Sequence, residues 1–293
     1  MVSRTTGIAA LSALLLCASH LAVAQSSSGL LRHAYTEAWK NNEGVDYSAS
    51  STAELAATRV LFVRIFRGER GRGLEDQARS AGWRIRTEAQ DGGDLTVVSE
   101  APDAIRGRGL YAFFNQGRHA LQAPHVPTDG LTGEILLGYA ADRLPRALAW
   151  NTVPRGRGDM AHLADTEFIE FSRAFATVHP NEKIIQLHGF DVDKRKTAAA
   201  SSSGAIVSAT HRRPSNELRL AVNCLREQVE PATRLYGEDV RELGGTTNTV
   251  AKTLRAGGYE NFIHVEAALP LRERLLKDGT QRHSFFLCLG GSS

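Results

Sequence analysis

The sequence predicts an α/β fold, with a mixed, mostly parallel β-sheet flanked by helices on both faces. Through the second half of the chain, short apolar runs of strand length alternate with segments whose apolar residues recur at helical spacing. This alternation is typical of parallel strands joined by crossover helices. The 293 residues suffice for one large domain. Hydrophobic residues make up 42% and charged residues 23% of the chain, which indicates an ordinary globular protein.

The N-terminus has the three parts of a secretory signal peptide. Arg4 supplies a positive charge, residues 8–15 are apolar, and Ala22-Val-Ala24 offers the small residues of a cleavage site. The apolar stretch is too short to span a bilayer. We therefore expect cleavage near Ala24 and a soluble product that is secreted or periplasmic. The expected organisation is a signal peptide over 1–24, a Ser-rich flexible arm over 25–51 and a single α/β domain over 52–293.

The elements follow from local patterns of apolar, glycine and proline residues. Helices are predicted at 52–66, 74–81, 132–144, 159–179, 216–235 with a break near Pro231, 248–256 and 271–277. Strands are predicted at 83–87, 94–99, 110–114, 120–123, 184–187, 205–210, 262–266 and 284–289. The first two strands are expected to form a hairpin around a Gly-Gly turn, and Asp159 is expected to cap its helix. Residues 194–204 are polar and read as a surface loop.

Charge and cysteine content narrow the functional classes. The net charge is only +3 and the arginines are scattered without interleaved aromatics, so we expect no nucleic-acid partner. We also expect a monomer with no membrane partner after the signal is removed. Cys224 and Cys288 would then be the remaining cysteines, and in an oxidising compartment we expect a disulfide between them, two separate buried thiols being the alternative. Their spacing excludes a Cys-x-x-Cys metal site.

Residues that commonly bind metals lie at or beyond the ends of three predicted strands. The segment Gln122-Ala-Pro-His-Val-Pro-Thr-Asp-Gly-Leu-Thr-Gly-Glu134 places His125 and Asp129 four residues apart, His188 ends a second strand, and Glu266 ends a third. Functional groups gather beyond the carboxyl ends of strands in such sheets. Two imidazoles and a carboxylate can hold zinc, and a further glutamate can act as general base toward water.

Each of these residues also has an ordinary structural alternative. Asp129 could cap a neighbouring helix, and His188 could be a hydrogen-bonded core histidine. Glu266 could be the ion-pair partner of Arg272, since a charge at the end of an apolar strand is costly unless paired.

The order of these motifs resembles the zinc carboxypeptidase-like superfamily, nearest the branch of poly-γ-glutamate hydrolases and N-formylglutamate amidohydrolase relatives. The resemblance spans about residues 109–276 and rests on Pro124-His125, Asp129, Thr132-Gly-Glu134, Gln186-Leu-His188-Gly and Val265-Glu266 followed by Arg272. It implies a phosphorylase/hydrolase-like catalytic domain.

The resemblance also implies a role for each matching residue. It implies Zn²⁺ as cofactor, with His125, Asp129 and His188 as ligands. Glu266 would be the catalytic residue, and Glu134 would support the ligands without binding the metal. This sequence departs from the family in having Asp rather than Glu, four residues after the histidine instead of three. Glu134 is therefore the alternative carboxylate ligand.

Three further residues are candidates for contacts with substrate. Arg155 offers a bidentate fork for a carboxylate, and Asn151 precedes it in the same segment. Asn248 begins a helix whose free amides suit an anion, although it could instead cap that helix. His264 alternates with Glu266 on one strand face and is expected to buttress the site. We predict a zinc-dependent hydrolase of peptide or γ-glutamyl amide bonds, acting on small peptide-like or acidic polymer substrates.

Two other classes stay open. Gly117-Arg-His119 suggests a secreted histidine phosphatase, although Ala120 stands where that family has glycine and its second arginine is missing. A non-catalytic binding module on a degenerate hydrolase fold is the other alternative. A serine hydrolase is disfavoured, because the sequence has no Gly-x-Ser-x-Gly motif.

Overall fold

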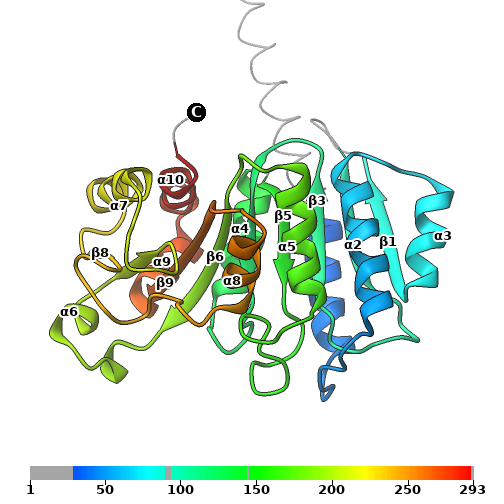
Figure 1. Ribbon diagram of the computed structural model, residues 1–293, viewed down its shortest axis with the longest axis horizontal. Coiled ribbons are helices and arrows are strands. Elements are labelled where there is room, and N and C mark those ends of the chain that lie inside the picture. Colours follow the sequence, from blue (N-terminus) through cyan, green and yellow to red (C-terminus); the bar gives the residue numbers. More distant parts are fainter. Residues whose placement is uncertain (1–28, 90–93, 144, 292–293) are drawn as a thin grey trace, which may run out of the picture.

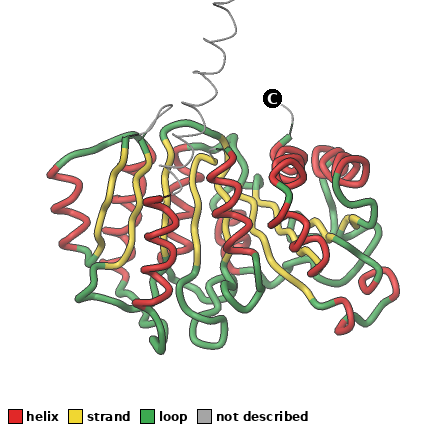
Figure 2. Tube along the Cα trace, turned by 180° about the vertical axis from the view of Figure 1, so that it is seen from behind, coloured by secondary structure: helices red, strands yellow, loops and turns green. Residues whose placement is uncertain are grey.

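The computed structural model describes residues 29–89, 94–143 and 145–291, which form one nine-stranded sheet with helices on both faces (Figures 1 and 2). This confirms the predicted fold class. The signal peptide over 1–24 and the Gly-Gly turn lie outside the described residues. Among the residues that are described, no helix combines the length and the apolar character needed to cross a membrane.

The strand order across the sheet is β1-β2-β3-β5-β4-β6-β9-β7-β8. The four central strands β5, β4, β6 and β9 run parallel to one another, whereas β1, β2 and β3 form an antiparallel meander that joins the block through β5. On the other side β7 pairs antiparallel with β9 and parallel with β8. The strands are β1 (Trp83–Glu88), β2 (Leu95–Glu100), β3 (Leu110–Phe114), β4 (Arg118–Ala123), β5 (Pro145–Trp150), β6 (Ile184–Phe190), β7 (Ala205–Ser208), β8 (Thr233–Leu235) and β9 (Phe262–Ala268).

One face of the sheet is covered by α2 (Thr52–Phe66), α3 (Arg72–Ser80), α5 (Glu167–Val178) and α8 (Thr249–Ala256). Aromatic rings dominate the packing there. Phe62 of α2 lies 5.9 Å from Phe171 of α5 and 4.8 Å from Tyr111 of β3, measured between ring centroids. Such edge and offset contacts between rings add to the burial of apolar surface.

The opposite face is covered by α4 (Thr132–Asp142), α7 (Asn216–Gln228), α9 (Leu269–Lys277), α10 (Gly279–Gly290) and a helix over residues 29–41. The last of these corrects the prediction of a flexible arm over 25–51. Leu31, Ala34, Tyr35 and Ala38 are spaced along one helical face, and all four are buried in this core. The helix over 29–41 therefore belongs to the packed domain.

Alternation along the central strands separates apolar residues from polar ones. In β6, Ile185 belongs to the core beneath α4. Gln186 and His188, two residues apart at the alternate positions, therefore both project from the other face. Gln122 of β4 pairs in register with Gln186, which pairs in turn with His264 of β9. A row of buried polar side chains therefore crosses three neighbouring strands on the α5 and α8 face.

The C-terminal segment differs from the prediction. A strand was expected over 284–289, but Gly279–Gly290 form α10, and the Asp278 side chain caps this helix by accepting from the amides of Thr280 and Gln281. A short apolar run does not distinguish a strand from a buried helix. The helix packs against α7 and α4.

Several shorter predictions also need correction. The expected helix over 216–235 ends at Gln228, and residues 233–235 form β8 on the sheet edge. The helix expected to start at Asp159 starts at Glu167, where the Thr166 hydroxyl provides the cap. A 3-10 turn, Val192–Lys194, leads into the expected loop over 194–204, which contains the short helix α6, Ala198–Ser201. Strand β5 was not predicted, and Pro145 stands at its first residue, a position where strands tolerate proline.

The predicted disulfide between Cys224 and Cys288 is present and joins α7 to α10, with 5.5 Å between the two Cα atoms. Disulfides of this kind are typical of oxidising compartments. Because 64 residues separate the two cysteines, the cross-link removes considerable loop-closure entropy from the unfolded chain.

We expect the double substitution Cys224→Ser and Cys288→Ser to lower the free energy of unfolding by about 4 kcal/mol in the chain-entropy model. Urea unfolding of the oxidised wild type and the double variant measures this difference. Reduction of the wild type with a thiol reagent should produce a loss of similar size, and an unchanged midpoint would contradict the expectation.

Candidate metal centre

The loop between β4 and α4 carries the first two residues of the site. His125 follows the end of β4, and a turn brings the chain back so that the Asp129 amide donates to the His125 carbonyl at 2.9 Å. The peptide bond between Val126 and Pro127 in this turn is cis. The Asp129 carboxylate thereby lies against the His125 ring, and both side chains are buried.

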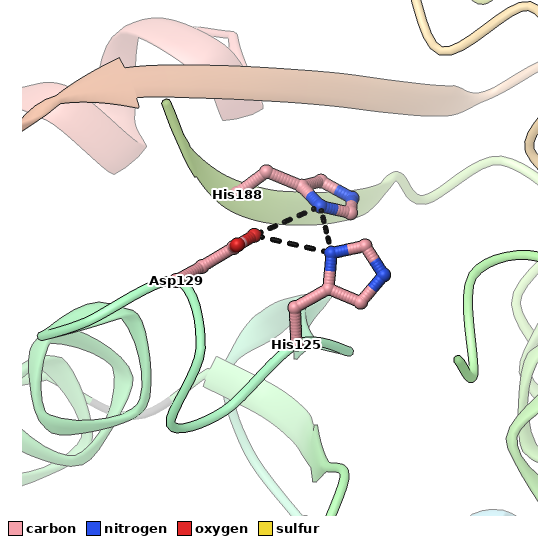
Figure 3. Close-up of side chains that lie close together, drawn as sticks. All are labelled: His125, Asp129 and His188. Carbon is pink, nitrogen blue, oxygen red and sulfur yellow. Dashed lines mark hydrogen bonds and ion pairs between the residues drawn. The ribbon is translucent and has the colours of Figure 1, made fainter. Parts of the chain in front are cut away.

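His188 completes a triangle of potential ligand atoms with these two residues (Figure 3). It lies in β6, the neighbour of β4 in the sheet. Its Nδ1 is 3.0 Å from Nδ1 of His125 and 3.3 Å from Oδ2 of Asp129, and the latter two atoms are 3.1 Å apart. The structure therefore brings together the three residues that were predicted as metal ligands.

The far nitrogen of each imidazole faces a hydrogen-bond acceptor. Nε2 of His125 lies 2.8 Å from Oδ1 of Asp159, and Nε2 of His188 lies 2.9 Å from Oε1 of Gln186. Each Nε2 must therefore carry a hydrogen. A neutral imidazole with hydrogen on Nε2 has its lone pair on Nδ1, which in both rings faces the triangle.

Three electron-rich atoms at these separations require a positive charge between them. A tetrahedral zinc ion with ligand distances of about 2.0–2.1 Å has neighbouring ligand atoms about 3.3 Å apart, close to the 3.0–3.3 Å found here. Hydrogen bonds from the far nitrogens to a carboxylate and an amide oxygen are the usual support of metal-binding histidines. The residues present thus fit a divalent metal of the zinc type, with Asp129 as the carboxylate.

The electrostatics of the triangle agree with this. Burial lowers the pKa of His188 to about 4, so this ring is neutral near pH 7. Burial also acts on Asp129, but the adjacent His125 and His188 rings outweigh it and hold the pKa of its carboxyl well below the usual range. Between two carboxylates, the pKa of His125 is raised despite burial. A proton on His125 or a metal cation can therefore supply the positive charge that the triangle needs.

Glu266 overlooks the triangle from β9. It pairs in register with His188, and its carboxylate lies 3.8 Å from Nε2 of His264. The His264 ring stacks on the His188 ring with centroids 4.4 Å apart, as expected for a residue that buttresses the site. Burial, followed by repulsion from Asp129, raises the pKa of Glu266 to about 8.

The expected alternative partner of Glu266 is engaged elsewhere. Arg272 donates to the Gly130 carbonyl at 2.6 Å, and no ion pair joins it to Glu266, although both residues are described. Its guanidinium lies over Gly189, where a β-carbon would approach Nη1 within 2.1 Å. A side chain after His188 would therefore have to displace this guanidinium. The backbone amide of Gly189 in turn donates to Asp129 at 3.2 Å.

Two further groupings of potential ligands share residues with the triangle. One joins His125, Asp159 and His162, and the other joins His188, His264 and Glu266. In the first, Arg155 already occupies the second oxygen of Asp159 at 2.9 Å. We therefore assign Asp159 to the support of His125.

Of the three residues predicted to contact substrate, Arg155 lies at the site, whereas Asn151 and Asn248 do not. Arg155 lies at the edge of the cavity above the triangle, with nearly half of its side chain exposed. Asn151 is fully buried, and its amide bonds to the Gly158 carbonyl and the Val153 amide. Asn248 is also buried and caps α8 by accepting from the Ala251 amide. Asn151 and Asn248 are therefore structural, and the substrate role predicted for them is wrong.

Glu134 lies outside the site. It is exposed in the first turn of α4 and accepts a hydrogen bond from the Tyr35 hydroxyl at 3.4 Å. It belongs to none of the ligand groupings found among the described residues. Neither the supporting role nor the alternative ligand role fits this position.

A cavity of about 1080 Å³ opens over the triangle. Glu266 and His264 lie in its wall together with His125, Asp129 and His188. The remaining charged residues of the wall are mostly basic, with Arg155, Lys194, Arg195 and Arg272 against Asp191 and Asp193. A bound divalent cation would make the cavity attractive to anionic groups.

His119, the residue behind the phosphatase alternative, lies at the opposite end of the sheet. It sits near the start of β4, whereas His125 follows the end of that strand. Its Nδ1 accepts a hydrogen bond from the Lys183 amide at 3.0 Å, and its ring packs against Gly290. This arrangement gives His119 a structural role and disfavours the phosphatase alternative.

Three residues of the site lie outside the sequence-based prediction: Asp159 was expected as a helix cap, and Gln122 and Gln186 belong to the quoted motifs but had no predicted role. The signal for the two glutamines was present. A polar residue inside an otherwise apolar strand that is buried on both faces needs a partner, and both Gln122 and Gln186 are 0% exposed.

Comparisons with known proteins return matches among solved structures. No protein-family model matches the chain, and no curated protein sequence matches it significantly. Among solved structures, a bacteriophage poly-gamma-glutamate hydrolase aligns with 71% of this chain and 86% of its own, at 10% identity and a TM-score of 0.35. A metallo-carboxypeptidase from Burkholderia cenocepacia aligns with 83% of this chain and 70% of its own, at 10% identity and a TM-score of 0.38. The chemistry of the site rests on its own geometry, since both TM-scores are below 0.5.

We expect His188→Ala to lower the affinity for Zn²⁺ by at least roughly 100-fold, because loss of a supporting partner alone costs 10- to 100-fold in metal sites. Competition with a chromogenic chelator measures the affinity. The control is His33→Ala, since His33 is exposed on the helix over 29–41 and should leave the affinity unchanged. Equal affinities in the two variants would exclude His188 as a ligand.

The raised pKa of Glu266 predicts how the stability of the metal-free protein depends on pH. The folded state holds a proton on Glu266 up to a pKa of about 8, whereas the unfolded state releases it near 4.5. The free energy of unfolding that the protonated Glu266 contributes at low pH is therefore lost as the pH rises through this window. Relative to Glu266→Gln, the wild type should lose up to about 5 kcal/mol between pH 4.5 and 8. Urea unfolding across this range, in the presence of a chelator, tests the difference.

The matched control is Glu75→Gln at an exposed position in α3. Its stability should follow that of the wild type at every pH. Parallel curves for the wild type and Glu266→Gln would contradict the burial of an uncharged Glu266.

Proposed function

We propose that this protein is a secreted zinc-dependent hydrolase that cleaves amide bonds of the peptide or γ-glutamyl type. The observation that carries the proposal is the triangle of His125 Nδ1, Asp129 Oδ2 and His188 Nδ1, whose spacing of 3.0–3.3 Å matches that of ligands around a tetrahedral metal. The site opens into a cavity, so a substrate would have access to a metal held by these residues.

The residues around the triangle can divide the chemistry of hydrolysis between them. A bound zinc ion polarises a carbonyl and lowers the pKa of a water molecule toward neutrality. Glu266 accepts the proton of the attacking water and delivers it to the leaving amine. A pKa of about 8 in the metal-free site suits this exchange, because a nearby cation lowers it toward neutral pH.

The cavity supports a substrate that carries a carboxylate. Arg155 is half exposed at the edge, and Arg272 lies in the wall without a carboxylate partner among the residues described. Guanidinium groups bind carboxylates through paired hydrogen bonds. Peptide-like molecules with a free carboxylate, or acidic γ-glutamyl polymers, therefore fit the proposal.

Two features support secretion. The N-terminal sequence has the layout of a signal peptide, and the Cys224–Cys288 disulfide is typical of proteins in oxidising compartments. Periplasmic and extracellular locations agree equally well with both features.

We expect Glu266→Gln to lower kcat/KM by roughly 100- to 10,000-fold, the usual contribution of a general base, with zinc content unchanged. The assay compares the zinc-loaded wild type and variant on short peptides, γ-glutamyl oligomers and N-acyl amino acids. Glu134→Gln is the matched control, because Glu134 is exposed outside the site and its loss should leave turnover unchanged.

The outcomes of this experiment separate the proposal from its alternative. Activity retained in Glu266→Gln would exclude this residue as the base. A wild-type protein that binds no stoichiometric zinc and hydrolyses none of these substrates would favour a binding module on a degenerate hydrolase fold.

A further inference from the structure

A continuous chain of buried hydrogen bonds runs beneath His188, and its direction is fixed at both ends. It connects α5, β4, β6 and the first turn of α8. The chain includes the polar row on the sheet, and its members are at most 3% exposed: Ser172, Gln122, Gln186, Asn248 and His188.

The first end is a backbone carbonyl. The carbonyl of Phe168 can only accept, so the Ser172 hydroxyl must donate to it, at 2.8 Å. The Ser172 oxygen then accepts from Nε2 of Gln122 at 2.8 Å. With its amide nitrogen committed, Gln122 presents Oε1 to Nε2 of Gln186 at 2.9 Å. Gln186 must in turn direct its own Oε1 away from Gln122.

The second end is a backbone amide. The N–H of Ala251 can only donate, so Asn248 presents Oδ1 to it, at 3.0 Å, and turns Nδ2 toward Gln186 at 2.5 Å. Both ends therefore require the same orientation of the Gln186 amide. Its Oε1 accepts from Asn248 and from Nε2 of His188, the latter at 2.9 Å.

This orientation decides which nitrogen of His188 carries the hydrogen. The Asp129 carboxylate lies 3.3 Å from Nδ1 of His188 and would favour a hydrogen on that atom. The Gln186 oxygen favours the hydrogen on Nε2 instead. A neutral imidazole has one N–H, so Gln186 leaves the Nδ1 lone pair free to face His125 and Asp129.

We propose that Gln186, oriented by Gln122 and Asn248, is a positioning residue that holds His188 in the Nε2–H tautomer and so prepares Nδ1 as a metal ligand. The role in metal binding rests on the proposed function. The tautomer itself does not, since it is set by the protein alone.

The first test needs no substitution. Long-range ¹H–¹⁵N correlation spectra of the metal-free protein distinguish the two tautomers of each histidine by their nitrogen shifts. We expect His188, assigned by comparison with His188→Ala, to be in the Nε2–H form at neutral pH. A hydrogen on Nδ1 would overturn the proposal.

The second test compares Gln186→Met with Gln186→Glu. Methionine fills a similar volume but offers no oxygen, so His188 should shift toward the Nδ1–H form and the Zn²⁺ affinity should fall 10- to 100-fold. A protonated glutamic acid accepts through its carbonyl and donates through its hydroxyl, as the glutamine does. Gln186→Glu should therefore keep the tautomer and bind Zn²⁺ more tightly than Gln186→Met.

This order separates positioning from packing. A residue needed only to fill the core would tolerate methionine better than glutamate, and Zn²⁺ affinity would then fall more in Gln186→Glu. That result, or an affinity in Gln186→Met within about twofold of the wild type, would overturn the proposal. Because neither readout involves turnover, a protein that hydrolyses none of the substrates tested can still confirm or refute the role of Gln186.

Discussion

The site depends on one constraint: three electron-rich atoms of His125, Asp129 and His188 lie within 3.0–3.3 Å of one another. Such an arrangement is unfavourable unless a positive charge lies between the atoms, because buried like charges and lone pairs repel strongly. The surrounding groups are arranged to maintain it. Asp159 and Gln186 each accept a hydrogen bond from a far imidazole nitrogen, which leaves the near nitrogens as acceptors.

The parallel centre of the sheet makes this convergence possible. β4, β6 and β9 are neighbours that run in the same direction, so the residues at their carboxyl ends meet above one edge. Apolar residues of these strands enter the core under α4, and the alternate positions form the polar row that includes Gln186. That row would be costly without partners. Helices α5 and α8 supply them through Ser172 and Asn248, so the same hydrogen bonds satisfy the core and direct the site.

The positions of Glu266 and Arg272 beside the triangle keep the two side chains from neutralising each other. Glu266 is close enough to Asp129 for burial and repulsion to raise its pKa, and a divalent cation would reverse that effect. Arg272 does not neutralise Glu266, because its guanidinium lies over Gly189 and bonds to the Gly130 carbonyl. The carboxylate therefore keeps its capacity to exchange a proton, and the guanidinium stays beside the cavity where an anionic substrate group would lie.

The sequence alone determined the α/β class, most strands and helices, the cysteine pair and the residues that form the triangle, because each leaves a local pattern of period, spacing or residue type. It did not identify the helix over 29–41, α10, Asp159 or Gln186. Those depend on partners far along the chain. The apolar run of α10 is buried against α4 and α7, and Gln186 gains a role only when β4, α5 and α8 surround it. The identity of a potential ligand is a local property, whereas the hydrogen bond that orients it exists only once distant segments have packed together.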